Sequence, residues 1–299
     1  MMTTLRRIRV ELSFLAALWK TNLLSALEYR ASFISQVLGM LLNNAAFLAF
    51  WLLFFQRFPK VNGWGMRDML GLYGMTATGF GLGVVLFGNA LSLADIISQN
   101  GLDPYLSLPR PVLLHVLASG SRISGWGDIL TGLLCMALLG PPDAAAWLRY
   151  GAAALVSMIV FISFLVLVAS LTFWIGSASA LSGSAINAIL AFATYPMSIF
   201  DGSAKLILLT VIPAGFIGAL PADFVRHYPG RGLAQLAAAA LVFLALALIA
   251  FHRGLRHYES GGLATGMGGV TGGRGVRGLI VGACPPPDLP PQGGGARTP

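Results

Sequence analysis

Long apolar stretches recur along the chain and alternate with short polar segments. An α-helix needs about 20 mostly apolar residues to cross the hydrocarbon core of a bilayer. Six stretches have about this length, at residues 33–55, 69–91, 123–139, 144–164, 177–199 and 233–251. The pattern therefore predicts an all-α integral membrane protein with six transmembrane helices.

Two further segments depart from this pattern. Residues 206–220 form an apolar stretch of only 15 residues, which Pro213 and two glycines interrupt. Because it is too short to cross comfortably, we expect a re-entrant helical hairpin before the last span. Residues 10–30 mix apolar side chains with charged ones such as Glu11 and Lys20. That mixture predicts an amphipathic helix lying at the membrane interface, rather than an early part of the first span.

The composition agrees with a membrane protein. Of the 299 residues, 56% are hydrophobic and only 10% are charged, and the mean hydropathy is +0.78. Soluble domains carry about 25% charged residues. So few charges cannot cover a water-facing surface, so most of the exposed surface must face lipid.

The excess of basic residues indicates an orientation rather than a nucleic-acid partner. The net charge is +8, and Lys and Arg gather on the cytoplasmic side of membrane helices. With both termini in the cytoplasm, twelve of the 19 Lys and Arg residues fall inside and seven outside. The basic N-terminus lacks the uniform apolar core and cleavage site of a signal peptide, so we expect it to be retained in the cytoplasm.

The last part of the chain differs from the rest. Residues 261–299 are rich in Gly and Pro and cannot form a core, so we expect a disordered tail. The sequence thus predicts one transmembrane domain, at residues 1–260, followed by that tail.

Several catalytic motifs are absent. The three lysines do not follow a glycine, so no P-loop for ATP is present. The four histidines are scattered without an H-E-x-x-H motif, and no G-x-S-x-G elbow occurs. Neither Cys135 nor Cys284 has the spacing of a metal or disulfide site. We therefore expect no catalytic residues, no metal and no cofactor on this chain.

Polar side chains inside the apolar stretches have two interpretations. They form hydrogen bonds between helices, or they line a substrate path. The candidates for a path are Asn43, Asn44, Thr76, Asn187 and Thr194. The charged Asp128 lies several residues into the third stretch, where it is either an interfacial helix-end residue or a functional group at membrane depth.

The loop between the second and third spans, residues 92–122, is the most informative segment. Leu93, Ile96 and Ile97 share one face of a short helix, and Gly101 ends that helix. Pro109 and Pro111 then punctuate the return to the membrane. A structured loop with apolar residues facing water predicts docking on a partner.

This loop also carries a family resemblance. The matching segments are Gly101-Leu102-Asp103, Tyr105-Leu106, Leu108-Pro109-Arg110-Pro111, Tyr195-Pro196, the stretch from Ile212-Pro213-Ala214 to Leu220-Pro221-Ala222, and the closing Gly254-Leu255-Arg256-His257-Tyr258-Glu259-Ser260. In this order, over about residues 5–260, the chain resembles the ABC-2 type transport permeases, in particular their six-helix bacterial export branch.

The resemblance implies partners and a place in the cell. Such permeases dimerise and recruit separate ATPase subunits, so it implies an ATP-binding-cassette ATPase and a second permease, either identical or related. It also implies contact with membrane lipid and residence in the bacterial inner membrane. The loop after the second span would be the ATPase-coupling element, formed by Leu93, Ile96, Ile97, Gly101, Leu102, Asp103, Tyr105, Leu106 and Pro109.

The function expected from these observations is export. The chain would be the membrane permease of an ATP-driven exporter, moving an amphiphilic small molecule or lipid-like substrate out of the cytoplasm. The alternative is a secondary transporter or channel without an ATPase, which predicts ionisable residues at mid-membrane or inverted repeats. A membrane enzyme predicts clustered acids and histidines, which we do not find, and a non-transporting scaffold is the remaining possibility.

Overall fold

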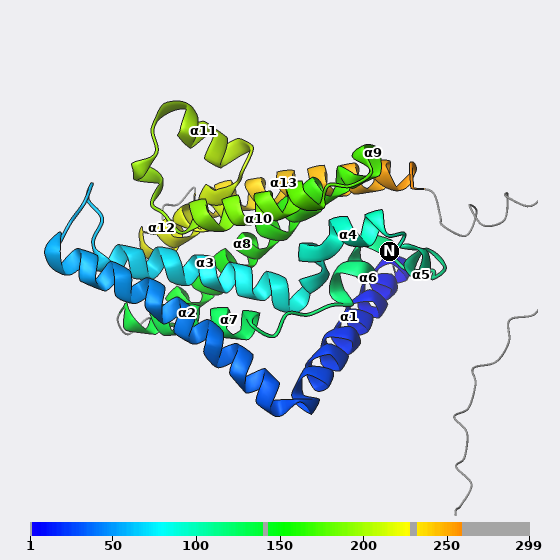
Figure 1. Ribbon diagram of the computed structural model, residues 1–299, viewed down its shortest axis with the longest axis horizontal. Helices are drawn as coiled ribbons and strands as arrows, with labels where there is room; N and C mark the ends of the chain where they lie inside the picture. Colours follow the sequence, from blue (N-terminus) through cyan, green and yellow to red (C-terminus); the bar gives the residue numbers. More distant parts are fainter. Residues whose placement is uncertain (1, 140–142, 228–231, 259–299) are drawn as a thin grey trace, which may run out of the picture. The chain divides into compact units, whose positions relative to one another are not determined.

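The structure is a computed structural model that describes residues 2–139, 143–227 and 232–258. The described residues form helices joined by short connections (Figure 1). The tail of residues 261–299, for which we expect disorder, lies outside them.

Four helices in the described part are long and apolar enough to cross a bilayer. They are α2 (Arg30–Arg57), α3 (Met66–Leu86), α8 (Ala144–Ser170, continued by α9, Thr172–Ile175) and α13 (Gly232–Leu255). They coincide with the first, second, fourth and sixth predicted spans. The all-helical prediction is thus confirmed, together with four of its six long spans.

The other two predicted spans are shorter than expected. Helix α7 (Gly125–Leu138) has 14 residues and α10 (Ser179–Ala193) has 15. At about 1.5 Å per residue neither helix alone reaches the ~30 Å of a hydrocarbon core. Helix α10 ends early because Pro196 disfavours a helical backbone at the residue before it. Six spans are therefore not shown by helix length.

A bent helix pair occupies the position of the predicted hairpin. Helix α11 (Gly202–Thr210) and the segment 214–226, which contains η3 (Ala214–Phe216) and most of α12 (Ala219–His227), meet at 64°. Pro213 lies at the break, as the sequence indicates. The pair is either one broken span or a re-entrant loop by its length and composition.

The N-terminal helix is separate from the first long helix. Helix α1 (Met2–Glu28) ends before Tyr29, whose backbone leaves the helical region (φ −101°, ψ 67°) and separates α1 from α2. The two helices form a V in Figure 1. Asn22 Nδ2 of α1 donates a hydrogen bond of 3.0 Å to the carbonyl oxygen of Ala118. This bond ties α1 to the loop that follows α3.

Helix α3 packs between α7 and α8, and α8 packs in turn against α13. Glycines allow the close approach of α3 and α7. A Cβ at Gly132 would lie 1.8 Å from Thr78 Oγ1, and one at Gly81 would lie 2.6 Å from the carbonyl oxygen of Gly125. Small residues on both helices therefore set the contact distance at the centre of the bundle.

Candidate functional site

The loop between α3 and α7 folds into four short helices. They are η1 (Gly88–Ser92), α4 (Leu93–Ser98), α5 (Asp103–Leu106) and α6 (Val112–Ala118). Asn100 adopts a left-handed backbone (φ 56°), which reverses the chain after α4, and the Gly101 N–H donates to the carbonyl oxygen of Ile96 at 2.8 Å. Pro104 lies in the first turn of α5, where its missing N–H is tolerated.

One side of this loop belongs to the core of the molecule. Leu93 and Leu102 have no exposed surface and Ile97 is 4% exposed, while Ile96 is half-buried. Helix α4 packs on α8, α9 and α10. The expectation that these apolar residues face water is therefore wrong for Leu93, Ile97 and Leu102. They attach the loop to the bundle instead.

The other side of the loop is exposed. Leu106 is 40% exposed and Leu108 is 46% exposed, and Pro104 and Pro109 are also exposed. We call these four residues the loop tip. Gly101, Asp103 and Tyr105 are half-buried behind it. The residues predicted to couple thus divide into an anchored set and a tip that a partner could reach.

Helix α1 holds the loop through an ion pair, a cation–π contact and an edge-to-face ring contact. Arg110 Nη1 lies 3.2 Å from Glu11 Oε1, and its guanidinium lies 4.3 Å from the centre of the Phe14 ring. The His115 ring makes edge contacts with both Phe14 and Tyr105, at 5.0 Å between centroids. Burial, followed by the charge of Arg110, lowers the pKa of His115, and Glu11 opposes this shift.

Two hydrogen bonds join the loop to later helices. The Tyr258 hydroxyl, just after α13, donates to Asp103 Oδ1 at 2.9 Å, and the Ser179 hydroxyl at the start of α10 donates to Asp95 of α4. Burial, together with the Asp103 carboxylate that accepts its proton, raises the pKa of Tyr258 to about 12. Residues separated by 155 and 84 positions therefore meet at this loop.

The loop is also braced internally. The Tyr105 and Ser119 hydroxyls lie 2.8 Å apart, and Asn89 Nδ2 donates to the carbonyl oxygen of Val116 at 2.9 Å. Arg122 donates to the Ser92 hydroxyl at 2.9 Å. These bonds connect both ends of the loop to its short helices, so the tip is carried on a rigid unit.

The candidates for a substrate path do not come together within one chain. Asn44 is 2% exposed on α2, and Thr76 Oγ1 of α3 lies 3.0 Å from the carbonyl oxygens of both Leu72 and Ala193. Both side chains therefore form hydrogen bonds within or between helices. Asn43 and Asn187 are exposed on α2 and α10, and Thr194, just after α10, is half-buried.

Asn44 belongs to a buried polar network that the sequence did not reveal. Its Nδ2 donates to Asp128 Oδ1 at 2.8 Å and to Thr131 Oγ1 at 3.0 Å, and its Oδ1 accepts from the Tyr73 hydroxyl at 2.8 Å. Asp128 lies in the first turn of α7, at a helix end, and is only 4% exposed, so its carboxylate faces neighbouring helices rather than open solvent. An acid inside an apolar stretch is a visible signal in the sequence, but Asn44, which donates to Asp128, is 84 positions away.

A cluster suited to metal binding does not occur in the part of the chain that the structure describes: no three His, Cys, Asp or Glu side chains gather there. The residues named above instead place an exposed tip on a loop that is anchored to the surrounding helices.

Comparison with known protein families identifies the family of this chain. The family described as ABC-2 family transporter protein matches residues 41–262. The chain belongs to this family. It is therefore a multi-pass membrane protein of a transporter permease family, and such permeases are typically non-catalytic. No curated protein and no solved structure matches the chain.

The family match includes the whole loop of residues 92–122 and the buried network on α2, α3 and α7. The resemblance noted from the loop and its flanking segments is thus confirmed. An ATPase partner follows from membership of the family, although no partner chain is present in the structure.

Proposed function

We propose that this ABC-2 protein is the permease subunit of an exporter, which moves an amphiphilic small molecule or lipid-like substrate out of the cytoplasm. A separate ATP-binding-cassette subunit hydrolyses ATP. The observation that carries the proposal is the exposed tip on an anchored loop. An ATPase that drives transport needs a surface on which to dock, and that surface must be rigidly connected to the spans.

The loop tip is the proposed docking surface. Leu106 and Leu108 offer apolar side chains at the surface, and burial of each in an interface would contribute about 1.5–3 kcal/mol at most. Leu93 and Leu102 are fully buried behind them and join the loop to the bundle. A displacement of the tip therefore moves α4, and through Asp103 and Tyr258 it reaches the end of α13.

The proposed topology has six crossings with both termini in the cytoplasm of a bacterial cell, in its inner membrane. Contacts at the two ends of the bundle support it. Asp95–Ser179 and Asp103–Tyr258 join elements at the loop end, whereas Asp68 of α3 pairs with Arg226 of α12. In this arrangement α7 and α10 each run from one end to the other despite their short length.

Two peripheral elements complete this topology. Helix α1 lies in the membrane interface on the cytoplasmic side, where it contacts the loop. The bent pair α11–α12 forms a re-entrant hairpin on the outer side. The transmembrane domain extends over residues 1–260.

The proposed substrate path lies between two permease copies. Only 17% of the most apolar window of α2 is buried, and Asn43 and Asn187 are exposed on α2 and α10. These amides would face the path in a dimer, together with Thr194. Asn44 and Thr76 would support the path from within each copy, through the hydrogen bonds that they already make.

A secondary transporter without an ATPase is the second candidate, and Asp128 is the observation in its favour. Ionisable side chains at membrane depth commonly carry protons or ions. A transport assay in vesicles separates the two candidates: transport driven by ATP supports the exporter, and transport driven by a proton gradient without ATP supports the alternative.

The docking proposal is tested by affinity purification of the permease from cells that also produce its candidate ATPase. We expect Leu106→Asp with Leu108→Asp to lower ATPase recovery by about tenfold or more, since about 1.4 kcal/mol of lost binding suffices. Val61→Asp is the matched control, because Val61 is 39% exposed in the connection between α2 and α3 at the opposite end of the bundle. Equal recovery with both variants would refute the docking surface, and export that persists without the ATPase would refute the exporter.

A further inference from the structure

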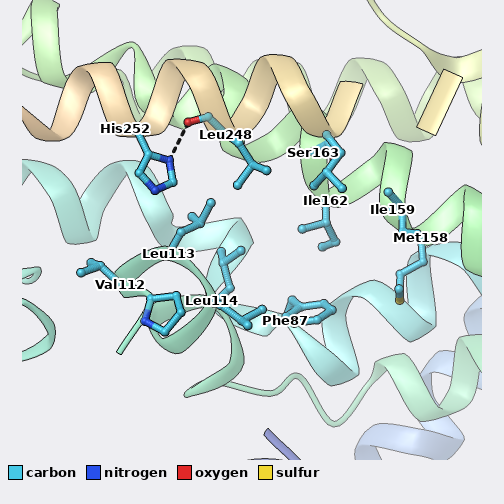
Figure 2. A pocket seen from close by; sticks show the side chains of 13 residues that line it. Phe87, Val112, Leu113, Leu114, Met158, Ile159, Ile162, Ser163, Leu248 and His252 are labelled. Atoms are coloured by element: carbon cyan, nitrogen blue, oxygen red, sulfur yellow. Dashed lines mark hydrogen bonds between the residues drawn. The ribbon is translucent and has the colours of Figure 1, made fainter. Parts of the chain in front are cut away.

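A cavity of about 390 Å³ lies between helix α6 of the loop and the long helices α8 and α13. Helix α6 forms one wall of the cavity, α8 the second and α13 the third. Figure 2 shows Leu113 and Leu114 of α6, Ile162 of α8 and Leu248 of α13 pointing toward the same space. The volume is within the range of small-ligand pockets, about 300–1,000 Å³.

The lining of this cavity is almost wholly apolar. Among the described residues that line it, Ser163 and His252 are the only ones whose side chains carry polar groups. The His252 Nδ1 atom is already 2.7 Å from the carbonyl oxygen of Leu248, one turn earlier on α13 (Figure 2). The occupant must therefore be apolar over most of its length, because a polar molecule would lose its hydrogen bonds to water without replacement.

The cavity opens onto the part of the protein that faces lipid. Leu244 and Leu248 line it and are each 38% exposed, and only 28% of the most apolar window of α13 is buried. Because α8 and α13 are both long enough to span the bilayer, an acyl chain can enter from the side without leaving the hydrocarbon region.

Basic residues stand at one end of the cavity. Exposed Arg253 and Arg256 follow the lining residue His252 at the end of α13. Basic side chains near the membrane surface attract anionic lipid headgroups by about 1 kcal/mol each. The distribution of charge and apolar surface thus matches a molecule with an anionic head and an apolar chain.

We infer that this cavity binds one acyl chain of an anionic phospholipid, with its headgroup beside Arg253 and Arg256. The lipid is a resident of the membrane rather than the transported substrate, because the cavity lies between α6, α8 and α13 and contains none of the path candidates on α2 and α10.

A bound chain would stabilise the coupling loop. Helix α6 carries His115, which contacts Phe14 and Tyr105, and the residue directly after α6, Ser119, forms a hydrogen bond with Tyr105. Filling the space between α6 and the spans would therefore fix the position of the tip relative to α8 and α13. This is a lipid dependence of coupling, which goes beyond the proposed export function.

The test uses the full-length permease in phosphatidylcholine vesicles that contain phosphatidylglycerol with a photoactivatable acyl chain. After illumination, peptide mapping locates the labelled residues. We expect labels on α6 and on residues 158–163 of α8. The measurement needs no ATPase and no transport, so it can succeed or fail independently of the export proposal.

Two variants of neighbouring residues make this test specific. Leu248→Trp places an indole ring in part of the cavity and should reduce labelling of α6 by about fivefold or more, the equivalent of about 1 kcal/mol. Ile249→Trp lies at the same depth on α13, is 49% exposed and does not line the cavity, so it should leave the labelling unchanged. Equal labelling in both variants would overturn the site, and thermal unfolding in detergent checks that both are folded.

A third variant tests the headgroup end. Arg253→Gln with Arg256→Gln should remove most of the preference for phosphatidylglycerol over photoactivatable phosphatidylcholine, by about fivefold for each arginine. An unchanged preference would overturn the headgroup assignment.

A truncated chain that ends at residue 258 tests whether the tail occupies the cavity. If this truncation increases labelling of α6, the natural occupant is the tail and not a lipid.

Discussion

At the scale of single residues, the Asn44 network shows how a membrane helix can carry several polar groups. Asn44 uses its amide nitrogen for Asp128 and Thr131 and its amide oxygen for Tyr73. Asp128 Oδ2 has no hydrogen-bond partner among the described residues. Asn44 is therefore the residue on which the other three converge.

Asn44→Ala should destabilise the protein by about 1–3 kcal/mol, because it leaves buried polar atoms of Asp128 and Tyr73 without a partner. Unfolding in mixed detergent micelles measures the change. Asn43→Ala is the control, since Asn43 is exposed and its side chain approaches Met40 Sδ at a distance of 3.9 Å. A cost for Asn43→Ala as large as that for Asn44→Ala would contradict a stabilising role of the network.

His115 should make the stability of the loop depend on pH. Its pKa is lowered in the folded protein from the ordinary 6.5, so below about pH 6.5 the unfolded chain binds a proton more readily. Stability should therefore fall as the pH decreases from 6.5 through the lowered pKa. His115→Gln should flatten this part of the thermal unfolding profile.

Arg110 supplies the control for this pH dependence. Its charge contributes to the lowered pKa of His115, so Arg110→Gln should weaken the slope in the protein that retains His115. The same change should have no effect on the slope when His115 is already Gln. If Arg110→Gln alters the slope equally in both backgrounds, another group is responsible.

At the scale of elements, the contact between α3 and α7 depends on glycine. Gly132→Ala would place a Cβ atom 1.8 Å from Thr78 Oγ1, which lies 2.5 Å from the Tyr150 hydroxyl. The helices would have to separate, at a cost of about 1–3 kcal/mol. Gly151→Ala on α8 meets no atom within 4 Å and should leave stability unchanged or slightly raise it. Thermal unfolding of the two variants in detergent compares them directly.

The same elements show which parts of the fold could be predicted from sequence. The length of the apolar stretches located α2, α3, α8 and α13, because so long an apolar stretch is stable only as a helix in a membrane or a protein core. It overestimated α7 and α10, because apolar residues in the turns beside Pro196 and before Gly125 look like helix. The prediction that Leu93 and Leu102 are exposed is wrong for a related reason. An apolar face on a short loop helix can pack against the core of the same chain as well as against a partner.

Partners distant in sequence were beyond prediction. Neither the bond between Tyr258 and Asp103 nor the ion pair between Arg110 and Glu11 has a local signature, since each joins segments about 100 or more residues apart. The family resemblance marked Asp103 and Tyr258 as part of recurring segments, but it did not bring them together. Only the packing of α1 and the end of α13 against the loop does so.

At the scale of the whole molecule, the loop is where α1, the start of α10 and the end of α13 meet. Tyr258→Phe removes the hydroxyl that bonds Asp103 and retains the ring, which still packs on Phe173. The bond to a carboxylate contributes about 1 kcal/mol once solvent exposure is considered. We therefore expect ATPase recovery on the permease to stay normal while transport per ATP hydrolysed falls by up to about fivefold.

Tyr195→Phe is the control for this loss of coupling, because Tyr195 packs on Trp51 and lies outside the loop. Its transport per ATP should remain that of the unaltered permease. Joint measurement of ATP hydrolysis and substrate efflux in vesicles distinguishes the possible results. If Tyr258→Phe lowers both rates in proportion, the end of α13 stabilises the permease without transmitting movement; if it lowers transport alone, the last helix is driven through the loop.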